Sequence, residues 1–409
     1  MQAPGNPKKI LFVENGIGYG GALICLRHLA RNLDTQKFHG RIITGRTGPE
    51  YLSISEDCEW RVIPDRRFDV VGFRKYLHAK AWPGDIPGLR MALNQLISRL
   101  DDFGNFLPFF WGLWNEVREF HPDIIHANNE PVCNRAALLL GRLLWIPTVC
   151  HVRGPQSGSW MMHRLYHTPD QFISVSKWID EGIGNLGIPQ SRRTIIYDGI
   201  ELSRLKPAEP RGEFRARYGV SENDFAVGLV GLLIPWKGQR LFIESAIELK
   251  SKIPGLKMMI IGGTPEDYRE FEAELREWVM KARLEDTVIF TGHITDMPTV
   301  YAALDVVVSA SLNPEPLGTV VIEAMAMGRP LVAPNHGGGA EMNIQGETAL
   351  LFEPGNASSL SESILRIHES SELARSLGAA ASERALRMFD VATHVIKVQE
   401  VYDKLLNSS

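Results

Sequence analysis

Short hydrophobic runs alternate with longer amphipathic stretches along most of this chain. In the first half the runs occupy residues 9–13, 40–44, 122–126, 147–151, 171–175 and 193–197. In the second half they occupy residues 225–231, 257–263, 287–292, 305–310 and 329–334. Apolar runs of this length, separated by helical stretches, are typical of parallel strands covered by helices on both faces. The pattern therefore predicts an α/β fold with two doubly wound sheets.

Proline and charged residues interrupt this rhythm in GIELSRLKPAEPRG, residues 199–212, which predicts a linker there. A chain of 409 residues also exceeds what one hydrophobic core usually serves. We therefore expect an N-terminal domain over residues 1–203 and a C-terminal domain over residues 204–390. A last helix is expected within residues 391–409.

Residues 67–120 do not follow the strand–helix rhythm and are predicted to form a helical insertion. One piece of it carries six aromatic side chains within twelve residues: Phe103, Phe106, Phe109, Phe110, Trp111 and Trp114. One interpretation is a helical hairpin packed into the N-terminal core. The other is an exposed aromatic surface that meets a membrane or a lipid-linked acceptor. In that case the neighbouring cations would pair with lipid phosphates: Arg66, Arg67, Arg74, Lys75 and Lys80.

The composition is that of a globular protein, with 44% hydrophobic and 22% charged residues. No apolar run approaches the ~18 residues that a membrane-spanning helix requires. The N-terminus lacks the apolar segment of a signal peptide, and the four cysteines form no C-x-x-C pair. These features predict a cytoplasmic protein with reduced thiols.

The charge is divided unevenly between the two halves. Residues 1–205 contain 24 Lys and Arg against 20 Asp and Glu, a net charge of +4, and the remainder contains 20 against 28, a net charge of −8. A mildly basic N-terminal half would suit an anionic acceptor or a membrane surface. No dense basic stripe occurs, so nucleic acid is not an expected partner.

The segment NPEPLGTVVIEAMAMG, residues 313–328, contains the most informative chemistry. Two prolines keep its start extended, after which Gly318 and Thr319 open a helix. A helix N-terminus offers free N–H groups to a phosphate, whereas Glu315 and Glu323 would repel one. Their purpose would instead be to accept hydrogen bonds from sugar hydroxyls, as in a sugar-nucleotide site. The alternative is an ordinary amphipathic helix with both carboxylates in water.

A glycine-rich turn, NGIGYGG at residues 15–21, follows the first predicted strand and precedes a helix. A dinucleotide-binding fingerprint would place an acidic residue at the end of the second strand, but that strand ends in Thr-Gly-Arg. The turn is therefore either a loop that approaches a donor phosphate or an acceptor, through Gly18, Gly20 and Gly21, or a simple tight turn.

Three further side chains stand at predicted strand ends. Lys237 lies between a strand end and a helix start, where an ammonium group can neutralise a diphosphate leaving group. His151 ends the strand PTVCH, and Arg153 follows it. The carboxyl ends of parallel strands line the ligand crevice in such folds, which favours a functional over a purely structural histidine.

The ordered set of these motifs carries a family resemblance. The set contains the glycine turn, the strand-end histidine, the Gly-x6-Gly segment with its lysine, and the two glutamates followed by NHGGGAEMNIQGETALLF. In this order of motifs the chain resembles a retaining glycosyltransferase of the GT-B fold, close to family 4 (glycosyl transferases group 1). The resemblance implies two facing Rossmann-like domains with the active site in the cleft between them. The N-terminal domain would bind the acceptor and the C-terminal domain the nucleotide sugar, and the last helix would cross back onto the N-terminal domain.

The resemblance also implies a role for each motif residue. Glu315 and His151 would contact the donor sugar, and Lys237 would hold the diphosphate. The other donor contacts would be Leu317, Gly318 and Thr319 near the phosphate, Glu323 at the ribose, and Thr291, Gly292 and His293 near the base. Gly20 and Gly21 would line the acceptor side.

One position departs from the family. An arginine often follows the first glycine of the lysine segment, and Leu232 stands there in this chain. Either Arg153, Arg193 or another basic group substitutes for it, or the activity is lower. The loss of such a charged hydrogen bond costs about 2–4 kcal/mol of transition-state stabilisation.

The leading hypothesis is transfer of a hexose from a nucleotide-diphosphate donor to a glycan or lipid-linked acceptor, in polysaccharide or glycoconjugate biosynthesis at the cytosolic face of a membrane. The sequence contains no D-x-D motif, so we expect neither a metal nor a cofactor besides the donor itself. Retention, with the leaving phosphate accepting the acceptor's proton, is implied by the family. The alternatives are a nucleotide-sugar 2-epimerase of the same fold and a non-catalytic sugar-nucleotide sensor, which Leu232 would suit.

Overall fold

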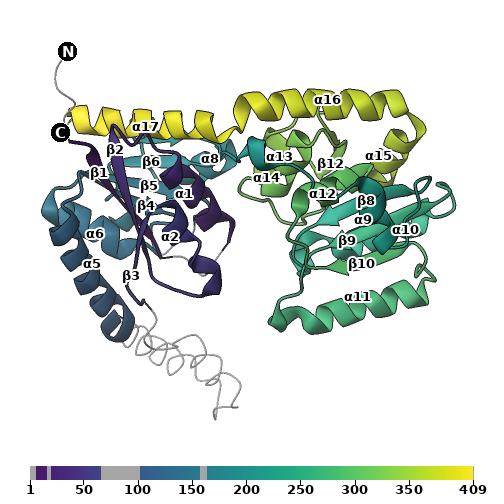
Figure 1. Cartoon of the computed structure of the whole chain (residues 1–409), viewed down its shortest axis with the longest axis horizontal. Helices are drawn as coiled ribbons and strands as arrows, with labels where there is room; N and C mark the ends of the chain where they lie inside the picture. Colours follow the sequence, from purple (N-terminus) through teal and green to yellow (C-terminus); the bar gives the residue numbers. More distant parts are fainter. Residues whose placement is uncertain (1–5, 16–19, 66–101, 157–163, 409) are drawn as a thin grey trace, which may run out of the picture. The chain divides into compact units, whose positions relative to one another are not determined.

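Two parallel sheets form the framework of the chain, each in its own compact unit (Figure 1). The structure is a computed structural model and describes residues 6–15, 20–65, 102–156 and 164–408. Unit 1 comprises Met1–Val175, Ile179–Ile196 and Val395–Ser409, and unit 2 comprises Ser176–Trp178 and Tyr197–His394. The predicted α/β class with two parallel, helix-covered sheets is therefore confirmed.

The sheet of unit 1 has seven strands in the described residues, in the order β3-β2-β1-β4-β5-β6-β7. The strands are β1 (Lys8–Glu14), β2 (Phe38–Thr44), β3 (Glu59–Val62), β4 (Ile124–Asn128), β5 (Thr148–Val152), β6 (Gln171–Ser174) and β7 (Arg193–Ile195). All six predicted strands of this half are present. The additional strand β3 lies at the edge, and none of its four residues is fully buried, so it carries no apolar run.

Successive side chains of a strand point to opposite faces, and helices cover both faces here. Leu11, Val13 and Ile125 pack on one face against Phe109 and Leu113 of α5. Among the described residues, the α-helices that lie wholly or mostly in this unit are α1 (Gly21–Arg31), α2 (Ile54–Asp57), α5 (Leu107–Phe120), α6 (Arg135–Leu144), α8 (Lys177–Asn185) and α17 (Val391–Ser408).

The last helix, α17, lies on the face opposite to α5. Its Tyr402 is fully buried, and the hydroxyl oxygen lies 2.7 Å from Nδ1 of His126 in β4. The Tyr402 ring also meets Phe38 edge-on at 5.7 Å. These contacts place the end of the chain, which follows unit 2 in sequence, in the core of unit 1.

The sheet of unit 2 has six strands in the described residues, in the order β10-β9-β8-β11-β12-β13. The strands are β8 (Phe225–Val230), β9 (Leu256–Ile261), β10 (Val288–Gly292), β11 (Val306–Val308), β12 (Leu331–Pro334) and β13 (Leu350–Phe352). All five predicted strands are present, and β13 is additional. The strand order reverses between β8 and β11, and ligands of open α/β sheets bind outside the carboxyl ends at such a point.

The helices of unit 2 pack in pairs on this sheet. α10 contacts α15, α13 contacts α16 and α12 contacts α9. The bounds are α9 (Arg211–Arg217), α10 (Gln239–Leu249), α11 (Arg269–Lys281), α12 (Met297–Ala303), α13 (Thr319–Ala326), α14 (Gly337–Glu341), α15 (Ala357–Glu369) and α16 (Ser371–Met388). Within the described ranges, none of the helices has the length and apolar character needed to cross a bilayer.

The predicted insertion at residues 67–120 is described only from residue 102 onward. Arg66, Arg67, Arg74, Lys75 and Lys80, and the side chain of Phe103, lie outside the described residues. In α5, Phe109 is buried in the core of unit 1, whereas Trp111 is 59% exposed. The aromatic segment thus contributes to the core and to the surface at once.

Replacement of Tyr402 tests how strongly α17 is held. Tyr402→Ala should lower the free energy of unfolding of unit 1 by about 3–5 kcal/mol, because it removes a fully buried aromatic ring. Ile396→Ala on the same helix is the control, since Ile396 is 55% exposed. Urea unfolding followed by circular dichroism measures both variants. Equal stability of the two variants would contradict the packing of α17 described above.

Candidate functional site

Three loops meet at the carboxyl edge of the unit 2 sheet. They follow β8, β11 and β12 and contain the short helix η5 (Pro235–Lys237), residues 309–318, and the start of α14. The amide of Leu312 donates to the carbonyl of Trp236 at 2.8 Å, and the amide of Gly338 donates to the carbonyl of Glu315 at 2.8 Å. The loop after β11 is thereby bonded to both of its neighbours.

Two glycines allow this close approach. Gly238 has a φ of 79°, and a Cβ there would lie 1.9 Å from the carbonyl oxygen of Ala310. A Cβ on Gly338 would lie 2.1 Å from the carbonyl oxygen of Pro316. Any larger residue would separate the loops, because both obstacles are backbone atoms.

Lys237 and Glu315, which the sequence places 78 residues apart, form an ion pair across these loops. The Lys237 Nζ lies 2.8 Å from Glu315 Oε1, and the two side chains are 18% and 19% exposed. The same ammonium group lies 4.5 Å from the centre of the Trp236 ring. The Ser311 hydroxyl also donates to Glu315 Oε1. A cation for an anionic ligand and a carboxylate for hydroxyl groups therefore lie side by side.

Helix α13 begins beside this pair, after Gly318 at a φ of 94°. No acidic side chain occurs in its first turn and no side chain caps it, so its N-terminal amides can meet an anion. Leu317, which directly precedes Gly318, is almost fully buried. The predicted phosphate position at Gly318 and Thr319 thus lies at a helix N-terminus without a side-chain cap, and its role stays a prediction.

Glu323 lies in the second turn of α13 and has one close partner. The hydroxyl of Tyr301, a fully buried residue of α12, donates to Glu323 Oε2 at 2.6 Å. Burial raises the pKa of Glu323, and the hydrogen bond from Tyr301 offsets part of this rise. Such a raised carboxyl pKa is common at functional sites. Neither Tyr301 nor Ser311 belongs to a recognisable sequence motif, so neither was predicted from the sequence.

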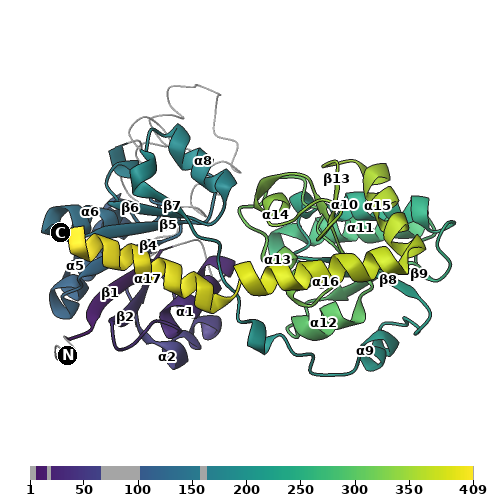
Figure 2. The ribbon, with the colours of Figure 1, turned by 90° about the horizontal axis from the view of Figure 1, so that it is seen from above.

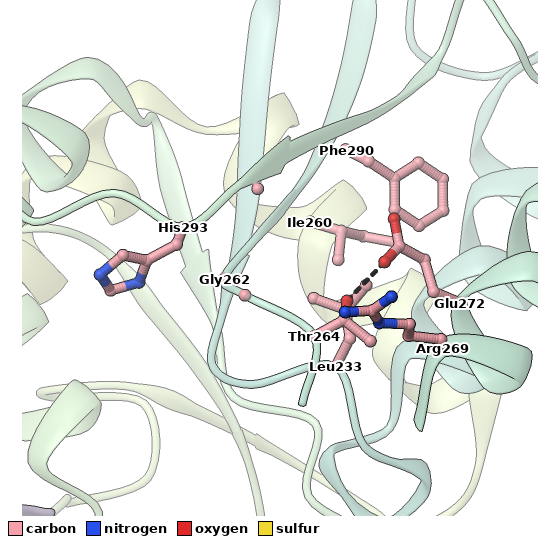
Figure 3. Close-up of a pocket in the computed structure, with 10 residues that line it drawn as sticks. Leu233, Ile260, Gly262, Thr264, Arg269, Glu272, Phe290 and His293 are labelled. Atoms are coloured by element: carbon pink, nitrogen blue, oxygen red, sulfur yellow. Dashed lines mark hydrogen bonds between the residues drawn. The ribbon is translucent and has the colours of Figure 1, made fainter. Parts of the chain in front are cut away.

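A pocket of about 290 Å³ lies at the carboxyl ends of β9 and β10 (Figure 3). Gly292 and His293 line it, whereas Thr291 is not among its lining residues. On the side away from His293 lie Arg269 and Glu272, and the Thr264 hydroxyl donates to Glu272 at 2.6 Å (Figure 3). These last three residues have no recognisable motif and were also missed.

The carboxyl edge of the unit 1 sheet holds a polar cluster. His151 in β5 is fully buried, and its ring centre lies 5.5 Å from that of His126. The Arg153 guanidinium donates to Asn128 Oδ1, and the buried Glu14 accepts from the amides of Asn128 and, at 3.2 Å, Asn129. His151 and Arg153 were predicted from the sequence, whereas Glu14, Asn128 and Asn129 were not.

The predicted glycine loop is only partly described. Gly20 precedes α1 in an extended conformation, and Gly21 is the first residue of that helix. A Cβ on Gly20 would have no neighbour within 4 Å among the described atoms, so its surroundings do not require glycine. Gly18 lies outside the described residues.

Leu232 occupies the position where the family often has an arginine, and Arg193 was one of the predicted substitutes for that arginine. Leu232 follows β8 and is 51% exposed. Arg193 begins β7, at the amino edge of the unit 1 sheet, and its Nη1 lies 2.5 Å from Asp180 Oδ2. Arg193 therefore has its own carboxylate partner at the opposite edge of its sheet. Across the described ranges, no three His, Cys, Asp or Glu side chains are grouped so as to hold a metal ion.

Two protein families match the chain, one in each half. The family Glycosyltransferase Family 4 matches residues 19–204. The family Glycosyl transferases group 1 matches residues 210–384. The second match includes Lys237 and both glutamates.

Among curated proteins, the chain is similar to the lipopolysaccharide core biosynthesis mannosyltransferase LpsB of Rhizobium meliloti. The two are 29% identical over 215 residues, which are 52% of this chain and 61% of the relative. The putative glycosyltransferase EpsD of Bacillus subtilis is 30% identical over 51% of this chain and 54% of its own length. The chain thus spans little more than half the length of these relatives.

Solved structures match over a larger part of the chain. The structure of Anabaena HepE in complex with UDP covers 97% of this chain and 100% of its own, with a TM-score of 0.79 at 23% identity. A glycosyltransferase from Rickettsia africae covers 99% of this chain with the same TM-score at 19% identity. Such similarity establishes the fold. The chain belongs to the group 1 glycosyltransferases, within glycosyltransferase family 4, and has the GT-B fold.

Proposed function

We propose that this protein transfers a hexose-type sugar from a nucleotide-diphosphate donor to a hydroxyl group of a glycan or lipid-linked acceptor, with retention at the anomeric carbon. The observation that carries the proposal is the Lys237–Glu315 ion pair beside the N-terminus of α13. It lies at the edge where the strand order reverses, the usual ligand position in such sheets.

The order of strands suggests how the donor lies on unit 2. The diphosphate would lie between Lys237 and the first amides of α13, and Glu315 would accept hydrogen bonds from the sugar hydroxyls. Glu323 would bind the ribose. The base would reach the pocket at β9 and β10, because these strands continue the sheet from β8 away from β11.

Donor binding would replace the Lys237–Glu315 contact with two contacts to the ligand. Cleavage of the anomeric C–O bond leaves negative charge on the departing diphosphate, which Lys237 and the α13 amides would stabilise. The leaving phosphate oxygen would then take the proton of the attacking hydroxyl. Neither a metal nor a further cofactor is required by this scheme.

The relatives support a glycolipid acceptor. LpsB is named for lipopolysaccharide core biosynthesis, and a Mycobacterium tuberculosis relative is named a GDP-mannose-dependent phosphatidylinositol monomannoside mannosyltransferase. We propose that Glu14, Asn128 and Arg153 of unit 1 take part in acceptor binding, at the cytosolic face of a membrane. A sensor that binds a sugar nucleotide without transfer remains the second candidate, because Leu232 leaves one diphosphate cation absent.

The proposal is tested with a panel of UDP-, GDP- and ADP-sugars, with EDTA present throughout. We expect slow nucleotide release from one donor class by the wild type and none by Glu315→Gln. Thermal shift on the same panel measures binding separately. Binding without turnover, even with added glycolipid extracts, would favour the sensor, and the absence of any binding would overturn the proposal.

Lys237 should contribute mainly to the chemical step. Lys237→Met should lower kcat by about 10²–10³-fold, because the charge on the leaving diphosphate loses one of its preorganised partners. Steady-state nucleotide release measures this effect, with the exposed Lys252→Met as the control for a general loss of charge. An unchanged kcat would remove Lys237 from the mechanism.

We expect the Glu323 carboxylate to lower the stability of unit 2 at neutral pH while it contributes to donor binding. Since burial raises its pKa, the folded state retains the proton to higher pH than the unfolded chain, and the stability of unit 2 falls as the pH rises from 4.5 through the raised value. Glu323→Gln keeps an acceptor for Tyr301 without the charge. We therefore expect a higher unfolding midpoint than wild type at neutral pH, together with weaker donor binding.

The difference in midpoint between Glu323→Gln and wild type should shrink as the pH falls from the raised pKa of Glu323 to 4.5, because the wild-type side chain then becomes neutral as well. Thermal unfolding across this pH range measures it. The exposed Glu362→Gln serves as the matched control and should stay within about 0.5 kcal/mol of wild type. A gap that is independent of pH would show that the carboxylate is not the cause.

A further inference from the structure

Helices α5 and α6 of unit 1, together with the residue after α6, carry large apolar side chains that are exposed in the described part of the chain. Trp111 is 59% exposed, Leu139 40%, Leu143 57% and Trp145 85%. Trp111 lies on α5, Leu139 and Leu143 lie on α6, and Trp145 directly follows α6. We call them, with Phe110, Trp114, Arg135 and Arg142, the α5–α6 surface.

The two helices place these residues together. α5 and α6 lie against each other on the same face of the sheet, in both views of the chain (Figures 1 and 2). Both connect parallel strands, so they run in the same direction. The Arg135 guanidinium lies 4.3 Å from the centre of the Phe106 ring, which aligns the starts of the two helices. Residues four and eight positions later, Phe110 and Trp114 on α5 and Leu139 and Leu143 on α6, follow on the same side of their own helix.

The surface is additional to a normal core face. Phe109 and Leu113 of α5 and Leu140 of α6 are buried against the sheet, as in any covering helix. The opposite side of such a helix is usually polar. Here it presents Leu139 and Leu143, one turn apart on α6, and the ring of Trp111. The centre of that ring lies 6.0 Å from that of Trp114, which is partly buried and packs against the core. Clustered exposed apolar groups of this kind mark an interaction surface.

Both charged residues of the α5–α6 surface are arginines, and Asp102 and Glu130 directly precede the two segments that carry it. No Asp or Glu occurs at residues 103–115 or 131–169, which include Arg135 and Arg142. The guanidinium of Arg142 lies 5.8 Å from the centre of the Trp145 ring. The nearest acidic residue of α5, Glu116, is bonded to Arg41 and Arg61, at 3.0 and 3.1 Å.

We propose that the α5–α6 surface binds the interfacial region of an anionic lipid bilayer. Tryptophan rings and leucine side chains favour the boundary between headgroups and acyl chains, and arginine pairs with lipid phosphates. A second copy of this chain is a poorer partner, because a symmetric contact would bring the same arginines together.

The position of the surface leaves the acceptor side free. Trp145 follows α6 and precedes β5, so it lies at the amino edge of the sheet. Glu14, Asn128 and Arg153 lie at the carboxyl edge. The inference rests on the proposed function only in so far as a lipid-linked acceptor would lie in the same bilayer.

Sedimentation of the full chain with phosphatidylcholine vesicles, with and without phosphatidylglycerol, tests the inference. The wild type should bind the anionic vesicles and lose binding at high salt. The double variant Trp111→Ser/Trp145→Ser, and separately Arg135→Gln/Arg142→Gln, should each bind at least about tenfold more weakly. Leu386→Ser, at a 60% exposed leucine of α16, is the control and should bind like the wild type.

Two results would overturn the inference. One is equal vesicle binding by the wild type and both double variants, or no binding by any of them. The other is a dimer of the wild type in sedimentation velocity without vesicles that both double variants abolish, which would assign the surface to self-association. Nucleotide release from the soluble donor should be unchanged in every variant, so a failure of vesicle binding is distinguishable from a failure of the proposed activity.

Discussion

The close backbone contact between the loops after β8, β11 and β12 is the constraint on which the unit 2 site depends. Gly238 against Ala310 and Gly338 against Pro316 leave no room for a side chain. Only at this separation do Lys237 and Glu315 reach each other, and only then does α13 begin beside them. The charge chemistry of the site is therefore set by two positions that carry no charge.

The two sheets share a topology but offer different groups at their carboxyl edges. Unit 2 presents an ion pair, free helix amides and a pocket, which suit a charged ligand with a base. Unit 1 presents a bonded cluster in which Asn128 accepts from Arg153 and donates to Glu14. Such a cluster is suited to neutral hydroxyl groups, because its charges are already compensated internally.

The strands were predictable because buried parallel strands are continuous apolar runs, and all eleven predicted runs form strands. The edge strand β3 was missed because none of its residues is fully buried. The three-residue strand β13 was also missed, although β7 and β11, which are equally short, were predicted. In the site, the linear motif revealed Glu315 and Glu323. Tyr301 and Ser311 could not be found in this way, because a hydrogen bond between separate elements leaves no pattern in the sequence. A strand end likewise identifies the edge where His151 lies, but not that its ring is fully buried.

The ion pair between Lys237 and Glu315 also bears on which molecules the empty site retains. A bare anion would gain Lys237 but would leave Glu315 unpaired beside a second negative charge. A molecule that carries both an anion and sugar hydroxyls satisfies both side chains at once. Under the proposed function, the nucleotide product no longer carries the transferred sugar. It then offers an anion to Lys237 but no donor-sugar hydroxyl group to Glu315. The re-formed ion pair would then compete with that product, so transfer itself would promote emptying of the site.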